Sequence, residues 1–211
     1  SNKPMNRLIQ GDVGSGKTIV AMLASAIVIH EKHQVAIMAP TEILAEQHFK
    51  SFQNYCNPIG INCTLLTSSK TQREKKSILK EIKNVAIQLV VGTHALIQEK
   101  VIFNKLGMII IDEQHRFGVE HRKLLIEKGL NPEVLAMTAT PIPRTLSITV
   151  HGDMNISIID ELPKDRLPVK TKIIYPKQLM DIYQTLKIEI DNGGQCFIVY
   201  PLIEESEVMD L

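Results

Sequence analysis

Short β-branched, largely hydrophobic runs alternate with longer helix-length segments along most of this chain. The runs predict strands at residues 7–12, 34–39, 62–67, 87–93, 106–112 and 133–138. Between them lie helix-length segments at 17–31, 42–55, 70–83 and 119–128. Strands that are continuously hydrophobic are typically buried on both faces, which is the pattern of a parallel sheet. The chain is therefore predicted to fold as an α/β domain with a mostly parallel central sheet and crossover helices.

The pattern changes near residue 153. The segment 153–168 contains two prolines and mixed charges and is interpreted as a linker. After it, the sequence predicts a strand at 169–176, a helix at 177–192 and a strand at 196–203. We therefore expect one complete domain at 1–152 and, at 169–211, the beginning of a second domain cut off at Leu211. This short half is expected to pack poorly or to borrow a neighbouring molecule, because it cannot bury both faces of a sheet.

Composition narrows the possible functions only slightly. The net charge of +1 neither requires nor excludes a nucleic acid, because a basic groove can lie on a neutral protein. Aromatic residues make up 4%, which argues against base stacking as the main mode of binding. The three cysteines lack C-x-x-C spacing, which indicates reduced thiols without zinc. No apolar run reaches the ~20 residues of a membrane span and no leader is evident, so a cytoplasmic protein without a membrane partner is expected.

The stretch GDVGSGKT carries the clearest chemistry, because it stands between a predicted strand and a predicted helix. It matches the phosphate loop G-x-x-x-x-G-K-[ST], whose backbone N–H groups surround nucleotide phosphates. In this loop Lys17 is expected to reach the β- and γ-phosphates, and the Thr18 hydroxyl to bind Mg²⁺. The alternative is a bare strand–helix turn. The predicted nucleotide-binding residues are Gly11, Asp12, Val13, Gly14, Ser15, Gly16, Lys17 and Thr18.

A second motif, which is acidic, comes after the apolar run MIII, for which burial is predicted. Asp112 is expected at the carboxyl edge of the sheet, where it can hold Mg²⁺ opposite Thr18, and Glu113 is placed to orient or deprotonate water. The alternative is that the Asp-Glu pair caps the next helix. A lone histidine such as His115 is more often packed or solvated than functional. The hydroxyls of Thr138-Ala139-Thr140 can sense the nucleotide or cap the next segment of the chain.

Several motifs together resemble a known family. They are GDVGSGKT, APTEILAEQHF, VVGTHALIQ, DEQHRFGVEHR, TATPIPRT and GQCFIVYPLIEESE. From about Pro4 to the end, the chain resembles the superfamily 2 DNA helicases, and among them the RecG family of ATP-dependent DNA helicases. The resemblance implies a RecA-like fold that uses ATP and Mg²⁺. The segment LLTSS at 65–69 departs from it, since a glycine usually follows the threonine in this family.

The resemblance also implies residue roles. Asp112 would bind the metal, Glu113 would activate water and Lys17 would complete the catalytic set. Residues coupling nucleotide to DNA would be Gln114, His115, Thr138, Ala139 and Thr140. DNA would contact Pro40, Thr41, Glu42, Gly92, Thr93, His94 and Arg144. The helix after Thr41 can equally be an N-capped amphipathic helix with Leu44, His48 and Phe52 in its core stripe, and both interpretations can hold. The lysine-rich segment 70–83 is interpreted as a solvated face.

For the whole protein the resemblance implies a monomeric double-stranded DNA translocase that remodels branched DNA, such as stalled forks and Holliday junctions. A second RecA-like domain would complete the ATP site with arginines, and an N-terminal wedge domain would recognise the branch, so the 211 residues alone are expected to bind ATP weakly and hydrolyse it poorly. The nearest alternatives are a transcription–repair coupling translocase and an RNA helicase. A small-molecule kinase and a non-catalytic nucleotide-binding module fit the motifs less well.

Overall fold

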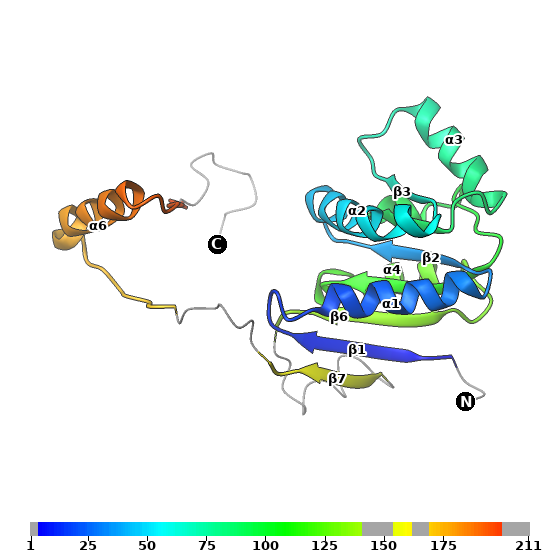
Figure 1. The fold of residues 1–211 in the computed structure, drawn as a ribbon, viewed down its shortest axis with the longest axis horizontal. Helices are drawn as coiled ribbons and strands as arrows, with labels where there is room; N and C mark the ends of the chain where they lie inside the picture. The colour runs from blue at the N-terminus through cyan, green and yellow to red at the C-terminus, as the bar shows by residue number, and fades with distance from the viewer. Residues whose placement is uncertain (1–3, 141–153, 162–168, 200–211) are drawn as a thin grey trace, which may run out of the picture. The chain divides into compact units, whose positions relative to one another are not determined.

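The computed structural model describes residues 4–140, 154–161 and 169–199 (Figure 1). The chain divides into two units, Ser1–Arg166 and Leu167–Leu211, each with its own internal contacts. Among the described residues, no helix combines the length and the apolar character that crossing a membrane requires.

The first unit is built on a seven-stranded sheet with the order β3-β4-β2-β5-β6-β1-β7. The strands are β1 (Asn6–Gly11), β2 (Gln34–Met38), β3 (Cys63–Leu66), β4 (Leu89–Gly92), β5 (Leu106–Asp112), β6 (Glu133–Thr138) and β7 (Asn155–Ile159). Each neighbouring pair of these strands is parallel. The predicted α/β fold with a parallel sheet is therefore confirmed, and the six predicted strands of the first domain are present.

Helices cover both faces of this sheet. They are α1 (Lys17–His30), α2 (Glu42–Cys56), α3 (Gln72–Lys83) and α4 (Val119–Ile126), with 3-10 turns η1 (Asn57–Ile59), η2 (His94–Ile97) and η3 (Gln114–Arg116). Figure 1 shows α1 and α2 on the near side of the sheet. Side chains alternate along β2, so that Val35 and Ile37 join the core under α1 and α2, whereas Ala36 and Met38 join a second core under α3 and α4. Two apolar cores thus enclose the sheet, as its continuous hydrophobic runs require.

The expected linker is wrong over residues 155–159, which form β7. This strand pairs in parallel with β1, from Arg7 opposite Asn155 to Gly11 opposite Ile159. The Arg7 Nη1 group donates a hydrogen bond to Ser157 Oγ at 2.6 Å. The β-branched residues around Ile156 favour a strand, whereas the prolines and charges that come after them favour a linker. Pairing with β7 satisfies backbone groups of β1 that an edge strand would expose.

The second unit contains the predicted helix, as α6 (Leu179–Asp191) after the 3-10 turn η4 (Pro176–Gln178). The predicted strands are wrong for the described residues of their segments, since 169–175 and 194–199 carry no strand. Ile173, Phe197 and Val199 are 86%, 85% and 89% exposed. A β-branched segment becomes a strand only when a neighbour accepts its hydrogen bonds, and no strand of this unit's described residues provides one.

Candidate functional site at the carboxyl edge of the sheet

The predicted nucleotide residues meet at one edge of the sheet. In the register of the parallel strands, Gln10 of β1 lies opposite Thr138 of β6, and Asp112 of β5 lies opposite Met137 of β6. The ends of β1, β6 and β5 are therefore level, and β5 is two strand spacings, about 10 Å, from β1. This edge is where open α/β sheets bind ligands.

The phosphate loop, Gly11–Thr18, has the backbone of an anion-binding loop. Gly14 and Gly16 have left-handed φ angles of 81° and 96°, which glycine adopts without strain. Gly16 is the N-cap of α1 and supplies no capping side chain, and the N–H groups at such a helix start are suited to bind an anion. The Lys17 Nζ group donates to Gly11 O at 2.7 Å and to Asp12 O at 2.8 Å. This lysine is therefore held against the loop, and the arrangement fits the phosphates of a nucleotide.

The acidic residues after β5 are set by an unusual backbone turn. Asp112 is only 9% exposed at the strand end. Glu113 comes next with a left-handed φ of 48°, a conformation that is costly for a residue with a side chain and that occurs most often at functional sites. Glu113 Oε2 lies 3.4 Å from both Thr138 Oγ1 and His115 Nδ1. The turn thus connects the acidic segment after β5 with the hydroxyl segment after β6.

The remaining predicted coupling residues lie beside this turn. The hydroxyls of Thr138 and Thr140 are 2.9 Å apart, and Ala139 lies between them in the chain. The Gln114 Nε2 group donates to Met154 Sδ at 3.4 Å, just before β7. Glu113, Thr138 and Thr140 thus form one connected group of contacts, whereas the Gln114 side chain contacts the residue before β7.

A magnesium ion fits the donors at this edge. Mg²⁺ takes oxygen ligands, commonly one or two carboxylates together with nucleotide phosphates and water. Asp112 offers a carboxylate at the end of β5, and Thr18 offers a hydroxyl in the first turn of α1. These donors suit a metal that is held largely by the nucleotide itself.

Sequence reasoning missed the partner of Asp112. The Nε2 group of His48, in α2, donates a hydrogen bond to Asp112 Oδ2 at 2.6 Å, and both side chains are 12% exposed. The expected core stripe of α2 holds for Phe52, which is 1% exposed. His48 lies one turn before Phe52, and its ring contacts the carboxylate. The signal in the sequence was a histidine on the apolar face of a helix, and nothing in its spacing identifies the partner.

The segments predicted to contact DNA come after β2 and β4, at the same edge of the sheet. Thr41 caps α2 by accepting a hydrogen bond from Leu44 N at 3.3 Å. Glu42 Oε1 accepts hydrogen bonds from Ser68 N at 2.8 Å and Ser69 N at 3.2 Å. Hydrogen bonding, first from the Ser69 side chain, lowers the pKa of Glu42 below its ordinary value. The carboxylate thus fixes the loop after β3, in the LLTSS segment that departs from the family.

The segment after β4 packs against the chain beyond the acidic turn. The His94 ring lies 5.5 Å from the Phe117 ring and meets the His121 ring edge to face at 4.7 Å. Burial, and then the proximity of His121, lowers the pKa of His94 below its usual range. Gly92 and Thr93 are buried where β4 ends. Arg144, the last predicted DNA contact, lies outside the described residues.

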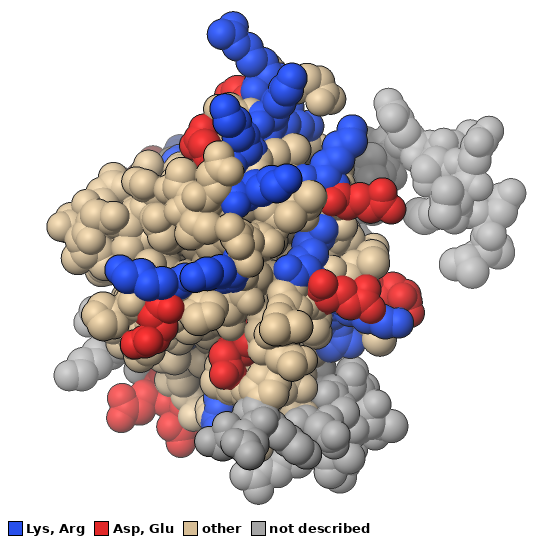
Figure 2. Space-filling view, turned by 90° about the vertical axis from the view of Figure 1, so that its right-hand side faces the viewer, with Lys and Arg blue, Asp and Glu red and all other residues tan. Residues whose placement is uncertain are grey.

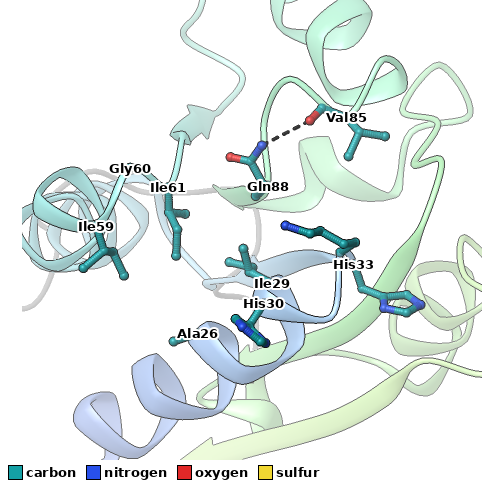
Figure 3. Close-up of a pocket in the computed structure, with 10 residues that line it drawn as sticks. Ala26, Ile29, His30, His33, Ile59, Gly60, Ile61, Val85 and Gln88 are labelled. Carbon is teal, nitrogen blue, oxygen red and sulfur yellow. Dashed lines mark hydrogen bonds between the residues drawn. The ribbon is translucent and has the colours of Figure 1, made fainter.

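Two other surface features of the first unit lie away from this edge of the sheet: a group of basic side chains and a hollow. Figure 2 shows lysine and arginine side chains gathered over α3, at the top of the view. A hollow of about 580 Å³ is lined by residues that include His30, Lys32, His33 and Gln88 (Figure 3). Gln34 and Leu89 begin β2 and β4, so this hollow lies at the amino edge of the sheet, opposite the phosphate loop. It is separate from the candidate nucleotide site.

Comparison with models of known protein families identifies the family of this chain. A family model for DEAD/DEAH box helicases matches residues 2–148. The chain belongs to this helicase family. This membership agrees with the phosphate loop, the acidic segment after β5 and the hydroxyl segment after β6.

Curated relatives of this helicase chain are ATP-dependent DNA helicases named RecG. The RecG of Aquifex aeolicus is 55% identical over 99% of this chain and 26% of its own length. The RecG of Streptococcus pneumoniae is 54% identical over 100% of this chain and 31% of its own length. The chain thus spans only about a quarter to a third of these relatives.

Solved structures agree with this likeness. A structure of RecG bound to a three-way DNA junction matches with a TM-score of 0.78 and 44% identity, over 96% of this chain and 27% of that one. The helicase domain of Hef from Pyrococcus furiosus matches with a TM-score of 0.59 and 22% identity, over 90% of this chain and 45% of that one. At that identity the second match shows the fold alone.

Proposed function

We propose that this chain is the ATP-binding half of an ATP-dependent DNA helicase that remodels branched DNA, such as stalled forks and Holliday junctions. The observation that carries the proposal is the level alignment of the phosphate loop, Asp112 and Thr138 on adjacent strand ends. The likeness to RecG over nearly the whole chain supports branched DNA as the substrate.

Each residue has a distinct task in this proposal. The phosphate loop binds the triphosphate, with Lys17 leaving its loop carbonyls to contact the phosphates. Thr18 and Asp112 hold Mg²⁺, which neutralises charge on the phosphates when it is bound. Glu113 orients and deprotonates the attacking water, because it directly follows Asp112 at the carboxyl end of β5. The 3.4 Å contact between Glu113 Oε2 and Thr138 Oγ1 connects the hydroxyl segment directly to the proposed general base.

The DNA contacts are assigned to the loops after β2 and β4. Hydroxyls, backbone N–H groups and helix N-termini bind phosphates without reading sequence, which suits an enzyme that moves along DNA. In the whole protein, which we infer to act as a monomer in the cytoplasm, a second RecA-like domain would close over the nucleotide and a wedge domain would recognise the branch. Closure and opening around ATP would then alternate the grip on DNA.

The test is ATP hydrolysis by the full-length protein with forked DNA, linear duplex DNA or RNA. We expect forked DNA to stimulate turnover most, and Lys17→Ala to abolish it. Lys50→Ala serves as a charge-matched control, because Lys50 is exposed in α2. Equal stimulation by linear duplex would favour a transcription–repair coupling type of translocase, and stimulation by RNA alone would favour an RNA helicase. Either result would refute the proposal.

A further inference from the structure

His48 connects two parts of the site that the sequence treats as separate. It lies in α2, seven residues after Thr41, and donates to Asp112 Oδ2 at 2.6 Å. An ionised carboxylate only accepts hydrogen bonds, so the imidazole N–H is the donor. The contact joins the helix that begins at a predicted DNA-contacting segment to the predicted metal ligand.

We propose that His48 is a positioning residue, which fixes the Asp112 carboxylate for Mg²⁺ and transmits DNA contact at the start of α2 to the nucleotide site. The proposal rests on the proposed function, because it concerns how the same site responds to DNA. It differs from the expected packing role of His48, since the ring contacts a buried charge.

The orientation of the carboxylate is the first part of the argument. His48 forms a hydrogen bond with Oδ2, which restricts rotation of the carboxylate. Both side chains are 12% exposed, so water competes weakly for this hydrogen bond. Groups that orient a metal ligand from behind typically change metal affinity by 10- to 100-fold when they are removed.

The rigidity of α2 is the second part. His48 is two helical turns, about 10 Å, from the Thr41 cap. Ala45 and Phe52, on the same side of the helix, are 0% and 1% exposed and lie in the core with β2 and β4. Because these side chains hold α2 against the sheet, a displacement at its first turn moves His48 as well. Glu42, in that turn, also fixes the loop after β3.

The experiment measures equilibrium binding of a fluorescent ADP analogue to the full-length protein over a range of Mg²⁺ concentrations, with and without forked DNA. His48→Leu keeps bulk but removes the donor. His48→Gln keeps an N–H at nearly the same reach, whereas the amide of His48→Asn stops short. His30→Leu is the control, because His30 is an exposed histidine at the end of α1.

We expect His48→Leu and His48→Asn to raise the Mg²⁺ concentration for half-maximal binding by about 10- to 100-fold, and His48→Gln to restore most of it. The factor by which DNA changes nucleotide affinity should fall toward one in the Leu and Asn variants. By linkage, the factor by which nucleotide changes DNA affinity should fall by the same amount. His30→Leu should match the wild type. Urea denaturation without Mg²⁺ measures the stability of each variant separately. If the Leu variant does not fold, comparison of the Gln and Asn variants still tests the role of the hydrogen bond.

Two results would overturn the proposal. One is wild-type Mg²⁺ dependence and DNA coupling in the Leu and Asn variants, with only stability changed, which would make His48 structural. The other is equal impairment of the Gln and Asn variants, which would exclude the hydrogen bond as the cause. Failure of the wild type to respond to any DNA would instead refute the proposed function, so the two failures are distinguishable.

Discussion

Gln34 offers a sharp test of what holds the sheet together, because its fully buried amide is satisfied on both sides. Its Nε2 group donates to Ile82 O and Ile87 O, each at 2.8 Å. Its Oε1 accepts from Asn104 N at 3.0 Å and Lys105 N at 3.2 Å. The side chain therefore ties the start of β2 to the end of α3 and to the segment before β5.

Gln34→Leu keeps the size of the side chain and removes all four hydrogen bonds. At about 1 kcal/mol for each intramolecular hydrogen bond, the free energy of unfolding should fall by ~4 kcal/mol. Water cannot replace the lost partners, because Gln34 is 0% exposed. For a protein of this size, ~4 kcal/mol corresponds to a decrease in melting temperature of roughly 8–16 °C.

The assay is urea denaturation of Gln34→Leu beside a matched variant, Gln88→Leu. Gln88 also makes two side-chain hydrogen bonds: its Oε1 accepts from Asn62 N at 2.8 Å, and its Nε2 donates to Val85 O at 3.2 Å (Figure 3). It is only partly buried, so water can solvate the released groups, and we expect a loss of about 1 kcal/mol. Equal losses in the two variants, or a loss below ~1 kcal/mol for Gln34→Leu, would refute the reasoning.

Three further substitutions probe other contacts of the first unit, and a fourth measurement concerns the activity of the 211 residues themselves. Gly92→Ala should lower the free energy of unfolding by about 1–3 kcal/mol, because its Cβ would lie 2.4 Å from Leu66 O. Gly118→Ala has its nearest neighbour at 3.9 Å, so it should cost less, through the loss of a glycine N-cap of α4 alone. Thr71→Ala should cost about 1 kcal/mol by removing the capping box of α3, and an unchanged denaturation midpoint would contradict this. The pKa of His94 is lowered from 6.5, so just below that pH the unfolded state binds more protons than the folded state. The free energy of unfolding should therefore fall as pH drops through this range, and it should fall less in His94→Gln. The 211 residues alone should show little ATPase activity with forked DNA, and turnover equal to that of the full-length protein would contradict this.

The parts of the site that lie in contiguous motifs could be predicted from the sequence. The phosphate loop is recognisable because its eight residues are neighbours in the sequence. The apolar run before Asp112 indicates the strand at whose end Asp112 lies. Once the sheet is known to be parallel, both must end at the same edge. The catalytic and DNA-contacting roles of these residues remain predictions.

The contact between His48 and Asp112 could not be predicted in this way. The two residues are 64 positions apart, and no spacing rule connects a helix face to a particular strand end. Helical periodicity correctly places His48 on the inner face of α2. Whether such a residue meets a methyl group or a carboxylate depends on how the helix crosses the sheet, and that is decided by packing among α2, β3 and β4.

The pairing of β7 with β1 changes how the nucleotide site connects to the chain beyond it. Ile159 lies opposite Gly11, the first residue of the phosphate loop. A Cβ at Gly11 would lie 3.1 Å from Ile159 Cβ and 3.2 Å from Ile159 O, so the loop begins in direct contact with this strand. Residues 155–159 are therefore held by the sheet and do not form the linker that the prolines and charges after them predict. This strand lies directly beside the loop that we propose to bind phosphate.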